Sequence, residues 1–183
     1  MCGLDEVGRG ALAGPLVAAA VVLGEGFTHP LLRDSKRLSP TQRELMDPLI
    51  REAAVEVLVV EVSSQDIDRL GVGWANRHAI ERLLEVVPAD NYLVDGNLRL
   101  STSRPYRSVI GGDDLVPAIS AASIVAKVHR DRLMRELDRE CPGYLWAANK
   151  GYGSPAHLRA LAELGPSAHH RQSFLHQQDA LPF

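Results

Sequence analysis

The sequence predicts an α/β protein with a mixed β-sheet flanked by α-helices. Short valine-rich apolar runs alternate along the chain with longer segments whose apolar residues recur at helical spacing. The connections include both hairpin-like turns and helical crossovers, which together produce a mixed sheet. At 183 residues, of which 45% are hydrophobic, the chain is long enough for a buried core. We therefore expect a single domain over residues 1–183.

Two strands joined by a glycine turn begin the chain. The apolar segments 2–7 and 16–23 are typical of strands. A helix follows, because residues 39–42 (SPTQ) offer an N-cap serine, a proline at the first helical position and a capping-box glutamine. The next strand is predicted at 56–62, where the sequence is EVLVVEV.

The second half of the chain continues the alternation. The longest helical pattern has a small, apolar first half (AISAASIVA), which we expect to be buried. The helices predicted here are 74–87, 117–140 and 155–164. The strands predicted here are 91–95 and 106–110. Residues from about 140 to 183 are expected to form a helical and irregular C-terminal part.

Composition restricts the partners and the compartment. The net charge of -3 gives no overall basic field, so a nucleic acid would have to meet a local group of Lys and Arg side chains. Cys2 and Cys141 are too few and too far apart for a metal motif or a disulfide framework, which indicates a reducing compartment. No apolar stretch approaches the ~20 residues of a spanning helix. We expect a cytoplasmic monomer without membrane contact.

Four acidic residues occupy similar places in the predicted fold. Asp5, Glu6, Asp95 and Asp113 each lie at or near the C-terminal end of an apolar strand, beside a turn element. A single carboxylate there is usually a solvated turn residue. Several converging carboxylates repel one another unless a cation lies between them, and Mg²⁺ or Mn²⁺ prefers oxygen ligands. Such a site suits two-metal phosphodiester hydrolysis. Because adjacent strand residues point to opposite faces, Asp5 and Glu6 can share an ion only if the strand ends or kinks.

A glycine pattern, Gly8-Arg9-Gly10-Ala11-Leu12-Ala13, matches the G-x-G-x-x-G/A sequence of dinucleotide-binding turns. That turn must lead into a helix, because the pyrophosphate binds at the helix N-terminus. Gly14-Pro15 and a valine-rich run follow instead, so a dinucleotide-dependent enzyme is the weakest interpretation. The histidines lack zinc spacing with cysteine, and His169-His170 is expected in a polar, irregular tail.

Six segments make the chain resemble the bacterial ribonuclease HII family over essentially its whole length. One segment alone would be weak evidence, whereas the combination, with several segments in the family's order and spacing, is highly specific. The segments are GLDEVGRGALAGPLVAAAVVL, LRDSKRLS, YLVDGN, GGDDLVPAISAASIVAKVHRDRLM, NKGYGSPAHLRAL and GPSAHHRQSF. The resemblance implies an RNase H-like fold.

The resemblance also implies a reaction and its catalytic acids, which here are Asp5, Glu6, Asp95 and Asp113. Asp113 rather than Asp114 takes the fourth place, because the family's acid follows a glycine and precedes the SAAS segment by this interval. The implied activity is endonucleolytic hydrolysis 5′ of a ribonucleotide, in RNA/DNA hybrids and at single ribonucleotides embedded in duplex DNA. It leaves 3′-hydroxyl and 5′-phosphate ends, uses two Mg²⁺ or Mn²⁺ ions, and serves ribonucleotide removal from DNA.

Substrate contacts are implied by the same resemblance. Gly8, Arg9 and Gly10 form the loop that reads the ribose 2′-hydroxyl through backbone groups, which glycine allows to approach closely. Tyr152 resembles the tyrosine that stacks on the sugar of the deoxynucleotide after the ribonucleotide. The expected phosphate-facing side chains are Lys36, Lys127, Lys150, His170, Arg171 and Ser173. Ser123 is expected to pack at the start of its helix, and Asp131 to form an ion pair or another structural contact.

Two other functions stay open at this point. One is a different metal-dependent nuclease or strand-transfer enzyme on the same fold, and the other is a catalytically silent protein that binds hybrid duplexes. Gly111 stands where many relatives have a lysine, which removes one expected phosphate contact. The C-terminal Leu181-Pro182-Phe183 is too short a signal to indicate a sliding clamp as a partner.

Overall fold

The computed structural model describes residues 1–33 and 38–175. Within them, a five-stranded sheet has the strand order β3-β2-β1-β4-β5. Strand β1 pairs antiparallel with β2 and parallel with β4, so the predicted mixed sheet is confirmed. The strands are β1 (Cys2–Val7), β2 (Leu16–Leu23), β3 (Ala54–Val62), β4 (Tyr92–Asp95) and β5 (Tyr106–Val109).

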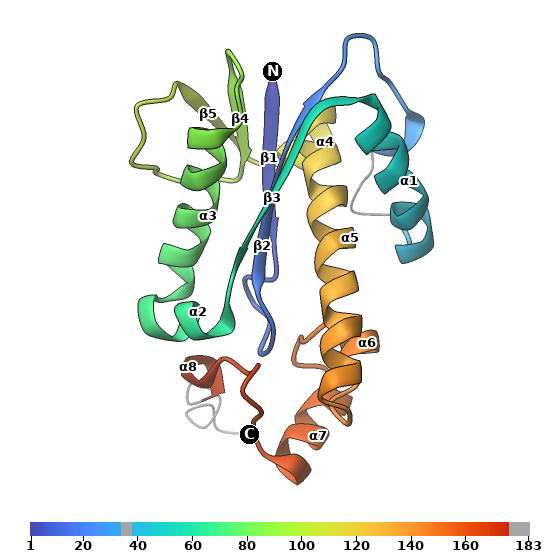
Figure 1. The fold of residues 1–183 in the computed structure, drawn as a ribbon, viewed down its shortest axis with the longest axis vertical. Helices are drawn as coiled ribbons and strands as arrows, with labels where there is room; N and C mark the ends of the chain where they lie inside the picture. The colour runs from blue at the N-terminus through green and yellow to red at the C-terminus, as the bar shows by residue number, and fades with distance from the viewer. Residues whose placement is uncertain (34–37, 176–183) are drawn as a thin grey trace.

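Helices cover both faces of the sheet (Figure 1). One face packs against α2 (Ser64–Leu70) and α3 (Val72–Val86), and the other against α1 (Pro40–Ala53) and α5 (Pro117–Glu140). The remaining helical segments are η1 (Pro30–Arg33), α4 (Gly112–Leu115), α6 (Trp146–Asn149), α7 (Pro155–Leu164) and α8 (Gln172–Leu175). The predicted capping box begins α1, where the Ser39 hydroxyl accepts from the Gln42 amide and the Gln42 side chain accepts from the Ser39 amide.

Strand β2 shows why the sheet has a core on each face. Its alternating residues Ala18 and Ala20 join the apolar cluster beneath α3, whereas Val17, Ala19 and Val21 join the cluster beneath α5. A strand buried on both faces is a continuous apolar run, as this one is.

Helix α5 lies unusually close to β1 at Gly3. A Cβ placed on Gly3 would lie only 2.1 Å from the carbonyl carbon of Ala118. Only glycine therefore permits this approach, which brings the middle of α5 over the residues that follow Gly3 on β1.

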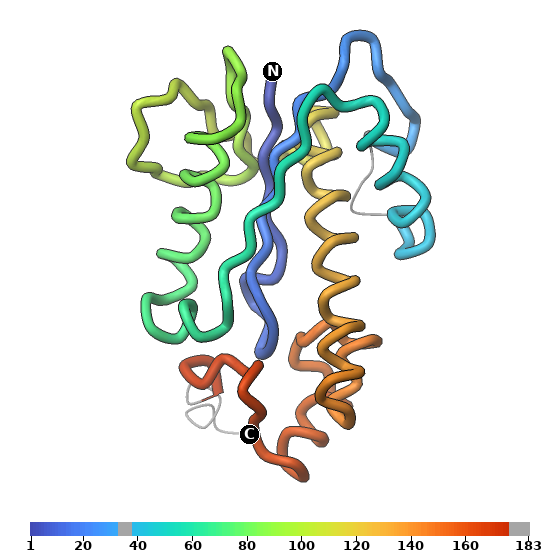
Figure 2. Tube along the Cα trace, viewed as in Figure 1, coloured from blue at the N-terminus to red at the C-terminus, as the bar shows by residue number. Residues whose placement is uncertain are grey.

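The C-terminal part returns to the beginning of the chain. After α7 it crosses beneath the sheet to reach α8 below α2 (Figures 1 and 2). On the way, His170 forms a β-bridge with Ala13, and the carboxylate of Asp68 accepts hydrogen bonds from the amides of Gln172 and Ser173. The chain between α7 and α8 is irregular, as expected, but it is packed against the protein, since His170 is only 2% exposed.

The short helices were not predicted. Directly after the strand predicted at 56–62, Ser63 caps α2 by accepting from the Asp66 amide at 3.0 Å. The glycine turn leads directly into β2, as expected, so the dinucleotide-binding arrangement is absent from this part of the structure. No helix in the described ranges is long and apolar enough to span a membrane.

Candidate active site

Asp5 and Asp95 lie side by side at the ends of two parallel strands. Leu4 on β1 pairs with Val94 on β4, so the two acids are the next residues on neighbouring strands. Leu4 and Val94 both point into the core beneath α3. Because side chains alternate along a strand, both acids project toward the α5 face.

Asp5 is 5% exposed, and its surroundings hold its pKa at about 7, well above the usual range of a carboxyl group. Burial is the largest cause of this raised pKa, and the charges of Glu6 and Asp95 add to it. A hydrogen bond from Ser123 and the positive charge of Lys127 act in the opposite direction. Both residues are on α5, where the Lys127 ammonium donates to the Ser123 hydroxyl at 2.7 Å. A line of polar groups therefore leads from Lys127 through Ser123 to Asp5.

Glu6 points the other way, toward α3. Its Oε1 accepts from Asn76 Nδ2 at 3.3 Å and lies 3.4 Å from Arg9 Nη1. Strand β1 continues regularly through Val7, which pairs with Val17, so the backbone does not kink between Asp5 and Glu6. Burial raises the pKa of Glu6, and the nearby charge of Asp95 contributes. Glu6 therefore interacts electrostatically with the Asp5–Asp95 pair from the opposite side of the strand.

Asp113 reaches the same sheet edge through the turn after β5. The Gly112 amide donates to Asp95 Oδ1 at 2.7 Å, which fixes the start of α4 against the end of β4. Asp113 follows directly and is 3% exposed, whereas Asp114 is exposed. Asp113 is therefore the buried acid of the two, and its place as the fourth acid stays a prediction.

The chemistry of these donors fits a hard divalent cation. The charges of Glu6 and Asp95 raise the pKa of Asp5, the charge of Asp95 raises the pKa of Glu6, and a cation would relieve that repulsion. In their present rotamers, however, no three His, Cys, Asp or Glu side chains within residues 1–33 and 38–175 are arranged to hold a metal ion. The carboxylates would therefore have to rotate to share one.

The Gly8–Gly10 turn lies directly beyond the acids on β1. Gly8 has a φ of 90°, a left-handed conformation that favours glycine. Arg9 and Gly10 are exposed, and their amides donate no hydrogen bond to any other described residue. The amides of Arg9 and Gly10 are thus available to a ligand, a few residues from the acids.

The predicted substrate-contact residues fall into two groups, those that a ligand can reach and those that the C-terminal segment holds in other contacts. Lys127 and Lys150 are half-buried, and Lys150 donates to the Ala147 carbonyl at 2.7 Å. Tyr152 is 40% exposed, so its ring is accessible from solvent. Lys36 lies outside the described residues.

The structure does not support direct phosphate contacts for the C-terminal members of the set. Arg171 is fully buried and donates to the carbonyls of Gly14 and Arg9, and His170 is almost fully buried. The Ser173 hydroxyl donates to Asp68 at 2.6 Å. These side chains fasten the C-terminal segment to the glycine turn and to α2, and we reassign them to that role.

Sequence comparison adds independent evidence at this point. Residues 2–177 match the family profile described as Ribonuclease HII. The chain belongs to the ribonuclease HII family. A ribonuclease HII of Rhizorhabdus wittichii is 51% identical over 177 residues, covering 95% of this chain and 87% of that protein. One from Porphyromonas gingivalis is 43% identical over 182 residues, covering 98% and 90%. As a family member, the protein is a ribonuclease H, a metal-dependent endonuclease.

Solved structures confirm the RNase H-like fold. The chain is similar to the RNase HII of Archaeoglobus fulgidus, solved as a complex with PCNA, with a TM-score of 0.81 and 24% identity over 100% of this chain and 97% of that one. A Bst-RNase HIII in complex with Mn²⁺ gives a TM-score of 0.68 at 19% identity, covering 95% of this chain and 63% of that one. At these identities the likeness concerns the fold alone.

Sequence reasoning missed several residues that build this site. Ser123 was expected only to pack, yet it contacts Asp5 and Lys127. Asn76 gave no signal, because a polar residue on a helical pattern is normally solvent-exposed, whereas it is buried against Glu6. The prediction for Asp131 is supported, since it lies 3.7 Å from Arg43 of α1 in an ion pair.

Proposed function

We propose that this protein hydrolyses the phosphodiester bond 5′ of a ribonucleotide, in RNA/DNA hybrids and at single ribonucleotides embedded in duplex DNA. The products carry 3′-hydroxyl and 5′-phosphate ends, and the cellular role is ribonucleotide removal from DNA in the cytoplasm. The whole chain, residues 1–183, acts as one catalytic unit. The observation that carries this proposal is the pairing of buried Asp5 with half-buried Asp95 on neighbouring strands, just before an exposed glycine turn.

Asp5, Glu6, Asp95 and Asp113 are the residues that would hold two Mg²⁺ or Mn²⁺ ions. Because Asp5 and Glu6 point to opposite sides of a regular strand, Glu6 would contribute its backbone carbonyl or hold a different ion from Asp5. Such ions, when bound, supply an activated water and stabilise the leaving oxygen of a phosphodiester. Asp5 has the central place, because both Glu6 and Asp95 act on its charge. Ser123 and Lys127 orient the Asp5 carboxylate from α5 through their hydrogen bonds.

Recognition of the ribose is assigned to the Gly8–Gly10 turn. A 2′-hydroxyl is both a donor and an acceptor, and it is the group that distinguishes RNA from DNA. The amides of Arg9 and Gly10 offer donors to the 2′-hydroxyl oxygen, and glycine lets the backbone approach the sugar closely. Tyr152 would stack on the next deoxynucleotide sugar, with Lys36, Lys127 and Lys150 near the phosphates.

A gel assay with end-labelled duplexes tests the proposal. One duplex contains a single ribonucleotide, a second is an RNA/DNA hybrid and a third is entirely DNA, each with Mg²⁺, Mn²⁺ or chelator. We expect metal-dependent cutting immediately 5′ of the ribonucleotide and none in the all-DNA duplex. Cutting that ignores the ribose would indicate a different nuclease. Binding without cutting under either metal would indicate a silent hybrid-binding protein.

The variant Asp95→Asn tests the assignment of the acids. It should abolish cutting while leaving the circular dichroism spectrum unchanged, because Asp95 is half-buried at a strand end and is not part of an apolar cluster. A folded Asp95→Asn protein that still cuts would refute the assignment of the acids.

A further inference from the structure

Arg130 on α5 is a buried cation without a carboxylate partner among the described residues. It is 1% exposed, and each of its guanidinium nitrogens donates to a backbone carbonyl. Nε donates to Pro15 at 2.9 Å, Nη2 to Ala13 at 3.1 Å and Nη1 to Lys150 at 2.8 Å. Burial lowers the pKa of Arg130, and the nearby Tyr152 and Asp131 act in the opposite direction. Burying a guanidinium charge without a carboxylate partner costs free energy, which indicates that Arg130 has a role other than filling space.

The carbonyls that Arg130 binds belong to two separate segments. Ala13 and Pro15 end the loop that begins with the Gly8–Gly10 turn, whereas Lys150 precedes Tyr152 by two residues. The guanidinium carbon also lies 5.4 Å from the centre of the Tyr152 ring. One side chain therefore contacts the base of the turn and the aromatic ring at the same time.

Two further observations show that the Gly8–Gly10 turn packs closely against Arg130 and the segment before Tyr152. A Cβ on Gly8 would lie 2.3 Å from Arg130 Nε, so the turn packs directly on the guanidinium. The amides of Leu12 and Ala13 both donate to the Gly151 carbonyl, at 2.8 and 3.2 Å, which adds a backbone link between the same two segments.

We infer that Arg130 is a positioning residue that sets the distance between the ribose-reading turn and Tyr152. This inference rests on the proposed function, because it assumes that the turn meets the ribonucleotide and that the tyrosine meets the following deoxynucleotide. Arg130 touches neither group of the substrate. It determines whether both contacts form on one strand at once, and so governs the preference for an RNA-to-DNA junction over continuous RNA.

Arg171 provides a natural comparison within the same chain. It is also fully buried and also donates to carbonyls of the loop, those of Arg9 and Gly14. Its guanidinium lies against Phe174 rather than against Tyr152. Arg171 therefore anchors the turn without joining it to the tyrosine, and its loss should affect every substrate that the turn reads.

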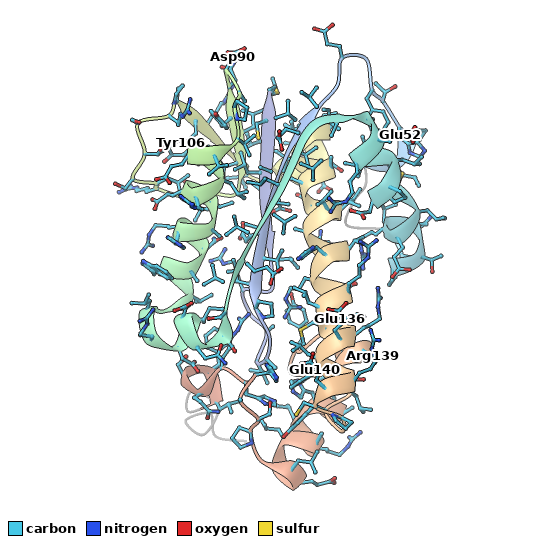
Figure 3. The ribbon with its side chains drawn as sticks, in the orientation of Figure 1. Glu52, Asp90, Tyr106, Glu136, Arg139 and Glu140 are labelled. Atoms are coloured by element: carbon cyan, nitrogen blue, oxygen red, sulfur yellow. The ribbon has the colours of Figure 1, made fainter. Side chains whose placement is uncertain are left out.

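The test compares kcat/KM for a duplex with a single ribonucleotide and for an all-RNA/DNA hybrid. Arg130→Lys replaces the planar guanidinium with a compact ammonium, which cannot reproduce all three hydrogen bonds in their present geometry, so we expect kcat/KM for the single-ribonucleotide duplex, divided by that for the hybrid, to fall by at least about 10-fold. Arg171→Lys should lower both values together and leave the ratio within about 2-fold of the wild type. Arg139→Lys, at an exposed position near the C-terminal end of α5 (Figure 3), should change neither value.

The ratio is independent of the fraction of folded enzyme, so partial misfolding does not affect it. Should Arg130→Lys give no folded protein, Arg130→Gln serves as the second variant. An unchanged ratio in a folded Arg130 variant overturns the inference while leaving the proposed function intact. If the wild type cuts neither ribonucleotide-containing duplex, the proposed function fails and the inference fails with it.

Discussion

Replacing Asp5 with asparagine should stabilise the metal-free protein at alkaline pH. The pKa of Asp5 is 3.8 in a model peptide and about 7 in the folded chain. The folded state therefore binds the Asp5 proton more tightly than the unfolded state does. The stability contributed by this proton is complete below pH 3.8 and is lost as the pH rises through 7.

The size of this loss follows from the pKa difference. A difference of about 3 units corresponds to about 4 kcal/mol of unfolding free energy. Asparagine is uncharged at every pH and avoids this cost, while its amide oxygen still accepts one hydrogen bond. The gain of Asp5→Asn over the wild type should therefore increase by about 4 kcal/mol between pH 4 and pH 8.

Urea unfolding in EDTA at several pH values measures this gain directly. Asp90→Asn, at an exposed position in the loop before β4 (Figure 3), is the matched control and should show no such trend. Adding Mg²⁺ at pH 8 should reverse the order, because the wild type gains metal-binding energy that the variant cannot. A variant that is no more stable than the wild type at pH 8 in EDTA would refute the burial argument.

Three further outcomes follow from the structure. Gly3→Ala should cost about 3 kcal/mol of unfolding free energy, because its Cβ would overlap the α5 backbone. Gly10→Ala should change the free energy of unfolding by less than ~1 kcal/mol, because a Cβ there meets no atom within 4 Å. The same variant should cleave a ribonucleotide-containing duplex more slowly, and normal cleavage would show that the turn does not take part in substrate recognition. Burial lowers the pKa of His170 from 6.5 to about 4, so the unfolded state binds more protons in this window; in Asp5→Asn, which lacks the opposing titration of Asp5, stability should fall by up to about 3 kcal/mol as pH drops through it. Trp146 fluorescence, beside His157 and His170, reports that change, and a flat response between pH 6.5 and 4 would contradict it.

The sequence predicted the parts of the site that follow local rules. Strand-end acids, the glycine turn and the capping box of α1 depend on neighbouring residues, and the structure contains each of them. The roles of Asn76, Ser123 and Arg130 depend on which elements meet in space. Their periodicity places them on helices, but periodicity does not say that a helix face will meet a carboxylate or a row of carbonyls.

His170 and Arg171 are a second case in which local sequence rules do not predict the contacts of a side chain. Their polarity and their place after the last long helix favoured a solvated tail, since charged residues are rarely buried without partners. Arg171 is nevertheless buried, because the loop supplies carbonyls that accept from all of its guanidinium nitrogens. Those carbonyls lie about 160 residues earlier in the chain, so no local pattern reveals them.

The buried arginines are kept apart from the acids of the site, and this separation leaves the acids able to bind a cation. A guanidinium beside Asp5 would lower the pKa of that carboxyl group and occupy the space that an ion needs. Arg130 and Arg171 instead direct their donors to backbone carbonyls, and no described cation lies within salt-bridge distance of Asp5. The positive groups that do approach are Lys127, which acts through Ser123, and Arg9, which is exposed and pairs with Glu6. The fold therefore uses its buried arginines to hold the loop of residues 8–15 and leaves the carboxylates under-neutralised, at a cost in stability that metal binding can recover.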